Sequence, residues 1–494
     1  MDLLLVSIPM DLGKKPYDLA FPFLKRLNFG ILAIASYMTE RGFHVGIFDP
    51  QAHPEEDCLI KLLQNIKQNS PNVIGLSCIS GFSYPSCLKI ASVIRQNFPS
   101  ITIFVGGKDH VGQIAESVLL ECLAIDIVVR GEGEEVLCQL IEHINQKKPL
   151  DDINNIVYRH LNGEICSTHY DLAFNPQKLP RLNYSLYPNF QTFAPSLEVG
   201  RGCTFSCEFC VSAKTGVRKK DISSIINEAE NITFIYGDNE ICIYLETPMF
   251  LMLDEEILEL AIKRQERNLK FTWRTSTRIE YLTPERLNKL AKAGCRVLDV
   301  GLESADFEIL LRMGKTRNPQ KYLERASEIL SVAYNLGIII KLNILFYIGE
   351  SLETIATTLS FIEQNLPYVV SVSAYPLLLY PGSSLEEGIG VEIKQYGGTI
   401  VTDGIWQSRH LWPVNPSAGL TYDFLQELGI LFTKSFQTME TFYKQKRYGY
   451  FSPQISYPEF VDAATNFGLD SLPFSRNLQE NVSNRKKLWN YLKN

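Results

Sequence analysis

Three cysteines stand within eight residues, in the run Gly202-Cys203-Thr204-Phe205-Ser206-Cys207-Glu208-Phe209-Cys210. Thiolates in this C-x3-C-x2-C spacing are soft ligands that suit iron–sulfur clusters and zinc. A structural zinc site needs a fourth cysteine or histidine at short range, but the next cysteine is Cys242 and the nearest histidine is His169, upstream. The run therefore favours a four-iron cluster that keeps one iron open to a further ligand, over zinc and over three buried cysteines that met by chance.

The residues on either side of this run alternate between apolar segments and helical patterns, from 196 to 385. Six strand–helix units predict a partial (β/α)6 TIM-type barrel, in which the chemistry sits at the C-terminal ends of the strands. The cysteine run follows the first of these strands. The expected strands are 196–199, 241–245, 271–273, 296–300, 338–346 and 369–373.

Residues 1–148 show a similar alternation, with apolar strands expected at 3–8, 45–48, 73–78, 101–105 and 125–129. This pattern predicts a Rossmann-like α/β domain with a doubly wound parallel sheet. Ligands of such sheets bind at the carboxyl ends of the strands. Small residues stand at those ends and let a bulky ligand approach the backbone: Ser7, Pro9, Ser77, Gly106 and Gly107.

Two further segments complete the chain. Residues 149–195 form a connector, with a hairpin expected from 155–159 and 164–168 and a turn at Asn162-Gly163. Residues 386–494 are expected to form a mainly helical C-terminal region that helps to enclose the substrate, with one helix at 421–443.

The composition narrows the classes of partner. A formal charge of −7 argues against nucleic acid as the main partner. No apolar run reaches the length of a membrane span, and the first residues lack the basic start of a signal peptide. Eleven cysteines in a chain of this size predict a reduced, cytoplasmic protein.

The cysteine run resembles the signature of the radical S-adenosylmethionine (SAM) enzymes. The N-terminal layout looks like the cobalamin (B12)-binding domain that precedes the radical domain in one class of them, with similar segments at 28–32, 42–45 and 130–134. The resemblance implies that Cys203, Cys207 and Cys210 hold a [4Fe–4S] cluster and that SAM chelates its open iron. It also implies cobalamin as a third cofactor.

The resemblance assigns further roles along the chain. Phe209 and Gly349 would lie beside the adenine of SAM, and Glu246 near its methionine amino group. Ser276 and Arg278 would face the ribose or the methionine carboxylate, and Glu303 would bind polar groups of SAM. Residues implied to contact cobalamin are Ser7, Pro9, Ser77, Gly106, Gly107, Gly131 and Glu132.

One histidine bears on the cobalamin assignment. Cobalamin domains of the methionine synthase type use D-x-H-x-x-G, whose histidine ligates cobalt, whereas this chain has Asp109-His110-Val111-Gly112. His110 is therefore interpreted as a loop or surface residue, and cobalamin is expected to bind without a histidine ligand. A sheet that has lost the cofactor is the alternative.

The resemblance implies a cobalamin-dependent C-methyltransferase that acts at an unactivated carbon. A 5′-deoxyadenosyl radical would abstract hydrogen from a small-molecule or peptide substrate, and methylcobalamin would donate the methyl group. An external electron donor such as flavodoxin or ferredoxin is expected as a partner. Two alternatives stay open: cyclisation, oxidation or rearrangement without methyl transfer, and a non-enzymatic iron–sulfur redox or metal-binding scaffold.

Overall fold

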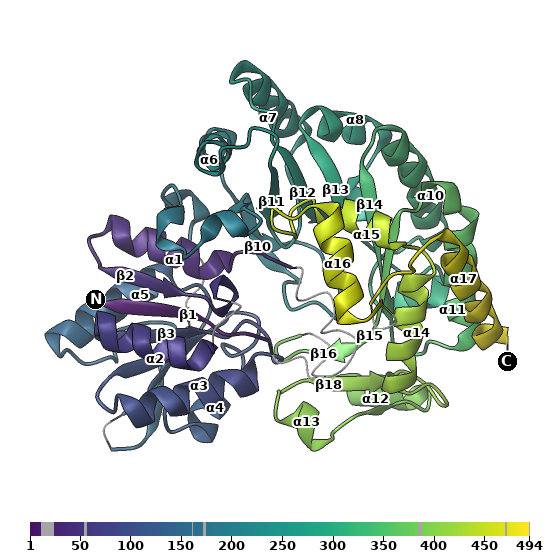
Figure 1. Cartoon of the computed structure of the whole chain (residues 1–494). Helices are drawn as coiled ribbons and strands as arrows, with labels where there is room; N and C mark the ends of the chain where they lie inside the picture. Colours follow the sequence, from purple (N-terminus) through teal and green to yellow (C-terminus); the bar gives the residue numbers. More distant parts are fainter. Residues whose placement is uncertain are drawn as a thin grey trace.

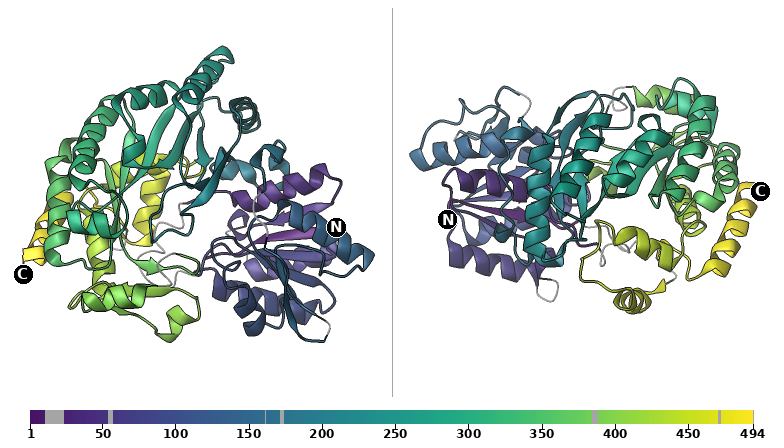
Figure 2. Two further views of the ribbon diagram at one scale, coloured as in Figure 1. Left: turned by 180° about the vertical axis from the view of Figure 1, so that it is seen from behind. Right: turned by 90° about the horizontal axis from the view of Figure 1, so that it is seen from above.

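The computed structural model describes residues 1–10, 24–53, 57–160, 162–170, 174–383, 388–469 and 472–493. Two α/β parts lie side by side in all views, and the C-terminal helices pack against the second part (Figure 1, Figure 2). The strands of the first sheet run from its outer side toward the second part, so that their C-terminal ends lie between the two (Figure 1).

The first sheet has seven strands in the order β2-β1-β3-β4-β5-β6-β7. The first five along the chain are parallel, and β6 and β7 form an antiparallel hairpin at one edge. The doubly wound sheet and the hairpin are both confirmed, but the hairpin from the expected connector is part of this sheet. The strands are β1 (Leu3–Ser7), β2 (Val45–Phe48), β3 (Val73–Ser77), β4 (Thr102–Gly106), β5 (Ile127–Val129), β6 (Ile156–Arg159) and β7 (Ile165–Ser167).

Helices cover both faces of this sheet, because its central strands are apolar on both sides. Along β1, Leu3 and Leu5 belong to one core with α1 and α5, whereas Leu4 and Val6 belong to a second core with α2, α3 and α4. Successive side chains of a strand point to opposite faces, which explains the division. The helices are α1 (Phe29–Glu40), α2 (Cys58–Asn69), α3 (Tyr84–Asn97), α4 (Ala115–Glu121) and α5 (Glu134–Gln146).

The second sheet has six parallel strands in the order β15-β14-β13-β12-β11-β8. This confirms the six strand–helix units of the predicted partial barrel. Helices surround its outer face (Figure 1). The strands are β8 (Ser196–Glu198), β11 (Cys242–Glu246), β12 (Thr272–Thr277), β13 (Cys295–Glu303), β14 (Ile339–Phe346) and β15 (Ser371–Pro376). The helices are α6 (Ile222–Tyr236), α7 (Asp254–Glu266), α8 (Pro284–Lys292), α9 (Phe307–Arg312), α10 (Pro319–Asn335) and α11 (Leu352–Gln364).

A small antiparallel hairpin, β9 (Gly200–Cys203) and β10 (Thr215–Lys219), carries the cysteine run, and the sequence analysis did not foresee it. Gly202 adopts φ +87°. A Cβ atom at Gly202 would lie 2.1 Å from the carbonyl oxygen of Gly216. Glycine is therefore needed for the two strands to approach each other.

The C-terminal region combines a small sheet with helices. The single helix expected at 421–443 is wrong: α14 (Tyr422–Lys434) ends and α15 (Met439–Lys446) begins anew. The reason is local, because Thr438 and Thr441 cap each other's backbone N–H groups in a capping box. The break lets α15 turn into the concave side of the barrel, where Arg274 Nη1 donates to the carbonyl oxygen of Gln445 at 3.0 Å.

The remaining elements lie in or next to this C-terminal region, between residues 378 and 493. They are β16 (Leu378–Leu379), β17 (Thr399–Ile400), β18 (Trp412–Asn415), α12 (Ile389–Gln395), α13 (Gly404–Gln407), α16 (Tyr457–Phe467) and α17 (Leu478–Lys493). Across the described part of the chain, none of the helices combines the length and the apolar character that crossing a membrane requires.

Candidate cluster and cofactor site

The three cysteines of the run lie at the end of β9 and in the loop that joins β9 to β10. Cys203 ends β9, and Cys207 and Cys210 lie in the loop that follows, where Cys210 N donates to Cys207 O at 3.1 Å. Burial raises the pKa of Cys210, and the neighbouring Cys207 and Cys203 raise it further. The three thiols thus belong to one short segment between β9 and β10.

This donor set fits an iron–sulfur cluster. All three side chains are free thiols, and thiolate is the ligand that such clusters use. Within the described residues, no three metal-binding side chains converge on a position for one metal ion. In a four-iron cluster held by these thiols, each cysteine would ligate a different iron.

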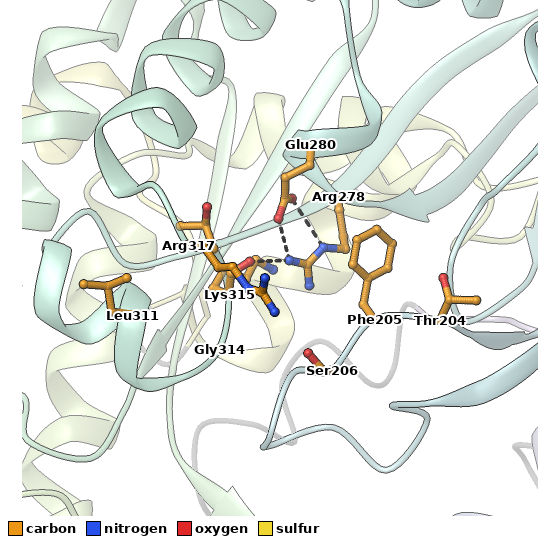
Figure 3. Close-up of a pocket in the computed structure, with 10 residues that line it drawn as sticks. Thr204, Phe205, Ser206, Arg278, Glu280, Leu311, Gly314, Lys315 and Arg317 are labelled. Atoms are coloured by element: carbon orange, nitrogen blue, oxygen red, sulfur yellow. Dashed lines mark hydrogen bonds and ion pairs between the residues drawn. The ribbon is translucent and has the colours of Figure 1, made fainter.

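Arg278 contacts the cluster loop directly. Its Nη1 donates to Cys207 Sγ at 2.6 Å, and its Nη2 donates to Glu280 Oε1 at 2.6 Å and to the carbonyl oxygen of Lys315 at 2.5 Å. The guanidinium also lies over the Phe205 ring, 4.2 Å from its centroid. The structure therefore places Arg278 beside a cluster cysteine, and Figure 3 shows its contacts with Glu280 and Lys315. The expected contact of Arg278 with SAM stays a prediction.

Glu303 lies on the same side of the barrel. It has φ +67° at an irregularity in the β13–β14 register, and its Oε1 accepts a hydrogen bond from Lys315 Nζ at 3.1 Å. Backbone strain of this kind is often found at functional sites. Lys315 and Arg278 both line a pocket of about 490 Å³, whose wall also includes Thr204 and Ser206 of the cysteine loop (Figure 3).

Glu246 and Ser276 lie on the neighbouring strands β11 and β12 and share a neighbour, Tyr244. The Tyr244 hydroxyl is 3.3 Å from Ser276 Oγ. Glu246 Oε1 accepts from Arg26 Nη2 at 2.6 Å, and the Arg26 guanidinium lies 3.9 Å from the centroid of the Tyr244 ring. Sequence reasoning missed Arg26, because nothing in its local sequence marks a partner 220 residues away.

Phe209 and Gly349 are both near Tyr347, the residue that directly follows β14. Phe209 contacts its ring, and Gly349 stands two residues later in the chain. The rings of Phe209 and Tyr347 are 6.2 Å apart in an edge-to-face arrangement. Gly349 has φ +79°, and its N–H donates to the carbonyl oxygen of Pro416 at 2.9 Å. The positive φ explains the glycine. Phe209 thus packs beside the segment that contains Gly349, and the contacts of both residues with adenine stay predictions.

The strand ends of the first sheet also come together. Ser7, Ser77 and Gly106 are successive register partners at its C-terminal edge, and Pro9 follows β1 two residues later. Asn28 Nδ2 lies 3.2 Å from the hydroxyl oxygens of both Ser7 and Ser77. Asn28 also caps α1, so one side chain joins two strand ends to a helix.

The two glycines after β4 have different surroundings. A Cβ at Gly106 would meet only Val129, at 3.9 Å, whereas a Cβ at Gly107 would lie 1.9 Å from the carbonyl oxygen of Cys78. Gly106 therefore leaves open space at the sheet edge, and Gly107 permits two backbone segments to pack. An open edge of small residues fits a bulky ligand such as cobalamin.

Glu132 makes contacts with the hairpin that carries the cysteines. It accepts from Arg218 Nη1 at 2.7 Å, and Arg201 lies 3.5 Å away. Arg201 also pairs with Glu134 at 2.6 Å and with Glu198 at 2.7 Å. Burial raises the pKa of Glu132, but the two arginines outweigh it and hold this pKa below its usual value.

His110 differs from its interpretation as a surface residue. It lies in the turn after β4, but it is fully buried and packs edge-on against Tyr84, with ring centroids 5.9 Å apart. Burial and the nearby His410 lower the pKa of His110 to about 4. The imidazole is therefore neutral near pH 7. The C-terminal region, which supplies His410, is what covers it.

Two protein families match separate parts of the chain. Residues 27–141 match the B12 binding domain family, and residues 197–362 match the radical SAM superfamily. The chain thus contains a B12-binding domain followed by a radical SAM domain. The radical SAM domain implies a [4Fe–4S] cluster and SAM, and the B12-binding domain implies cobalamin. Both domain types expected from the sequence are confirmed.

Two curated relatives and one solved structure extend the comparison. An uncharacterized methyltransferase of Pyrococcus horikoshii is 26% identical over 72% of this chain and 77% of that protein. An anaerobic magnesium-protoporphyrin IX monomethyl ester cyclase of Rubrivivax gelatinosus is 25% identical over 74% of this chain and 66% of that protein. The fold is similar to that of the cobalamin-dependent SAM radical enzyme OxsB, solved with aqua-cobalamin and SAM, with a TM-score of 0.70 at 16% identity over 99% of this chain and 78% of that chain.

Proposed function

We propose that this radical SAM protein is a cobalamin-dependent C-methyltransferase that acts at an unactivated carbon. The observation that carries the proposal is the group of ion pairs between Glu132 and Glu134 of the B12-binding domain and Arg201 and Arg218 of the cysteine hairpin. These contacts hold the cluster loop against the domain that would bind cobalamin. The similarity to a methyltransferase of Pyrococcus horikoshii supports methyl transfer.

The cofactors supply the difficult chemistry when bound, since the cluster with SAM provides a carbon radical and cobalamin provides the methyl group. The residues of the chain bind and orient them. Cys203, Cys207 and Cys210 would hold the cluster. The proposed SAM contacts are Phe209, Glu246, Ser276, Glu303 and Gly349. The proposed cobalamin contacts are Ser7, Pro9, Ser77, Gly106, Gly107 and Gly131, with Glu132 acting through its arginine partners.

The C-terminal region would help to enclose a small-molecule or peptide substrate. The Tyr450 carbonyl oxygen accepts from Lys25 N at 2.9 Å, and Arg274 and Asp299 form a buried pair beside α15. Segments from both ends of the chain thus lie at the barrel, where they would help to exclude water from a bound substrate. The proposed reaction also needs an external electron donor, such as flavodoxin or ferredoxin, to reduce the cluster. All eleven cysteines are free thiols, which supports a reducing compartment such as the cytoplasm.

A second candidate is cyclisation, oxidation or rearrangement without methyl transfer. The similarity to the cyclase of Rubrivivax gelatinosus favours it. The same cofactors and the same contacts would serve either reaction, so the fate of SAM distinguishes them.

The test uses the whole protein, reconstituted anaerobically with iron, sulfide and cobalamin, then reduced and given SAM alone. A methyltransferase of this kind should release S-adenosylhomocysteine in an amount that depends on the cobalamin present. Release of 5′-deoxyadenosine with no S-adenosylhomocysteine, in protein that carries both the cluster and cobalamin, would favour the second candidate. Protein prepared without cobalamin is the control and should form no S-adenosylhomocysteine.

A further inference from the structure

The hydrogen bond from Arg278 to Cys207 joins a cation to a sulfur that the proposed cluster would use. The donor and acceptor are 2.6 Å apart, and the Arg278 side chain is 9% exposed. A hydrogen bond from a charged donor is about twice as strong as a neutral one, and low exposure limits its screening by solvent. This contact therefore acts on the sulfur itself.

Three neighbours fix the guanidinium in this orientation. Glu280 accepts two of its hydrogen bonds, the carbonyl oxygen of Lys315 accepts another, and Phe205 packs against its flat face. Arginine presents a rigid fork of donors, so anchoring one side of the fork aims the other. Nη1 is the nitrogen that remains for Cys207 (Figure 3).

The charges around Arg278 are not symmetrical with respect to the sulfur. Glu280, which partly neutralises Arg278, is 31% exposed, and it accepts from Nε and Nη2 of the guanidinium, whereas Cys207 accepts from Nη1. The neighbouring Lys315 and Glu303 pair with each other. The charged group that contacts the Cys207 sulfur is therefore a cation, and this cation donates to the sulfur.

We propose that Arg278 is a positioning residue that raises the reduction potential of the cluster through Cys207. Reduction moves one electron from an external one-electron donor to the cluster, and the added negative charge is spread over its iron and sulfur atoms. A cation that donates to a ligand sulfur stabilises the reduced state more than the oxidised state. Arg278 would thus make the cluster easier to reduce before SAM is cleaved.

The first test is a potentiometric titration of the reconstituted holoenzyme, with the reduced cluster measured by electron paramagnetic resonance. We expect Arg278→Gln to lower the ratio of reduced to oxidised cluster about tenfold at a fixed potential, which equals about 59 mV for a one-electron couple. Arg278→Lys, which keeps the charge but not the fork, should show a smaller shift in the same direction. Arg317→Gln is the matched control, because Arg317 lines the same pocket but is exposed.

A second measurement does not depend on a variant that assembles its cluster. Wild-type protein labelled with 15N-arginine should show a nitrogen coupling to the reduced cluster in pulsed electron paramagnetic resonance. Absence of this coupling, or an unchanged potential in cluster-loaded Arg278→Gln, would overturn the proposal. An equal shift in Arg317→Gln would also overturn it.

This inference rests on the cluster assigned to Cys203, Cys207 and Cys210, and iron analysis separates the two. Wild-type protein that does not take up about four irons per chain would contradict the cluster assignment. Wild-type protein with its four irons but with no effect of Arg278 would contradict only the present inference.

Discussion

Arg201, two residues before the first cysteine of the cluster run, lies 2.6 Å from Glu134 at the start of helix α5 in the B12-binding domain. Their side chains are 12% and 4% exposed. The pair spans 67 residues of sequence and joins the two domains at the loop where the cluster is expected. The position of the cluster loop is thus coupled to the B12-binding domain by buried charge.

We predict that Arg201→Met lowers the free energy of unfolding by about 3–5 kcal/mol, because it leaves buried carboxylates without their common cation. Urea denaturation followed by circular dichroism measures the change. Lys178→Met is the matched control: Lys178 pairs with Glu135 on the same helix at a similar distance, but both side chains are about half exposed. Lys178→Met should leave the urea midpoint unchanged. Equal losses of stability in Arg201→Met and Lys178→Met would show that the burial of the Arg201 ion pairs does not decide the effect.

Substitutions at the adjacent Gly106 and Gly107 should have opposite effects on cobalamin binding and on stability. Gly106→Leu adds a side chain to open space at the sheet edge and should abolish copurification of cobalamin while leaving the thermal midpoint near that of the wild type. Gly107→Ala brings a Cβ against the Cys78 carbonyl oxygen and should cost about 1–3 kcal/mol of stability. Absorbance of bound cobalamin and thermal unfolding measure the two effects. Full cobalamin content in Gly106→Leu would show that cobalamin binds elsewhere.

Glu350 should impose a pH dependence on stability. Burial raises its pKa to about 8 from a usual value of 4.5. The folded state therefore holds a proton that the unfolded state releases, so this residue lowers stability as the pH rises from about 4.5 to 8. Glu350→Gln should match the wild type near pH 4.5 and exceed it by roughly 2–4 kcal/mol at pH 8, at 1.36 kcal/mol for each pKa unit.

Denaturation series at several pH values measure the effect of Glu350. Glu353→Gln is the control, because Glu353 is exposed in the first turn of α11, which begins just after Glu350; it should retain the wild-type slope of stability against pH. If Glu350→Gln also retains that slope, burial does not hold the proton on Glu350.

Loss of any one cysteine of the run should remove the cluster. Cys203→Ala, Cys207→Ala and Cys210→Ala should each reduce iron from about four per chain to near zero after anaerobic reconstitution, together with the brown absorbance. Cys166→Ala, in the hairpin strand β7, is the control and should keep its iron. Normal iron content and SAM cleavage in the triple variant would disprove the assignment.

Local patterns in the sequence predicted much of the fold. The apolar segments of both sheets lie where the strands formed, because alternating strand and helix patterns are set by neighbouring residues. Polar and glycine residues after those strands then had to meet at a common edge, as Ser7, Ser77 and Gly106 do. The helix break at Thr438 also had a local signal, since Thr438 and Thr441 have the spacing of a capping box.

Other features had no local signal. The β9–β10 hairpin is short and polar, so it lacks the apolar alternation that marks a strand. His110 stands in a polar loop, and it is buried by packing against Tyr84 and against the C-terminal region that supplies His410. Arg278 follows a barrel strand, as expected for a SAM contact. Whether its guanidinium reaches SAM or Cys207 depends on the orientation that Glu280 and Lys315 impose on it.

By itself, the sequence determined the ligand chemistry. Three thiols within eight residues stay close to one another whatever the fold of the rest of the chain, so they can bind one cluster together. It also determined the two α/β architectures, because the spacing of apolar residues along the chain distinguishes strands from helices. Only the tertiary structure decided that Glu132 and Glu134 would pair with Arg201 and Arg218. Charge acts through space, and these partners lie far apart in sequence, so no pattern along the chain can specify them.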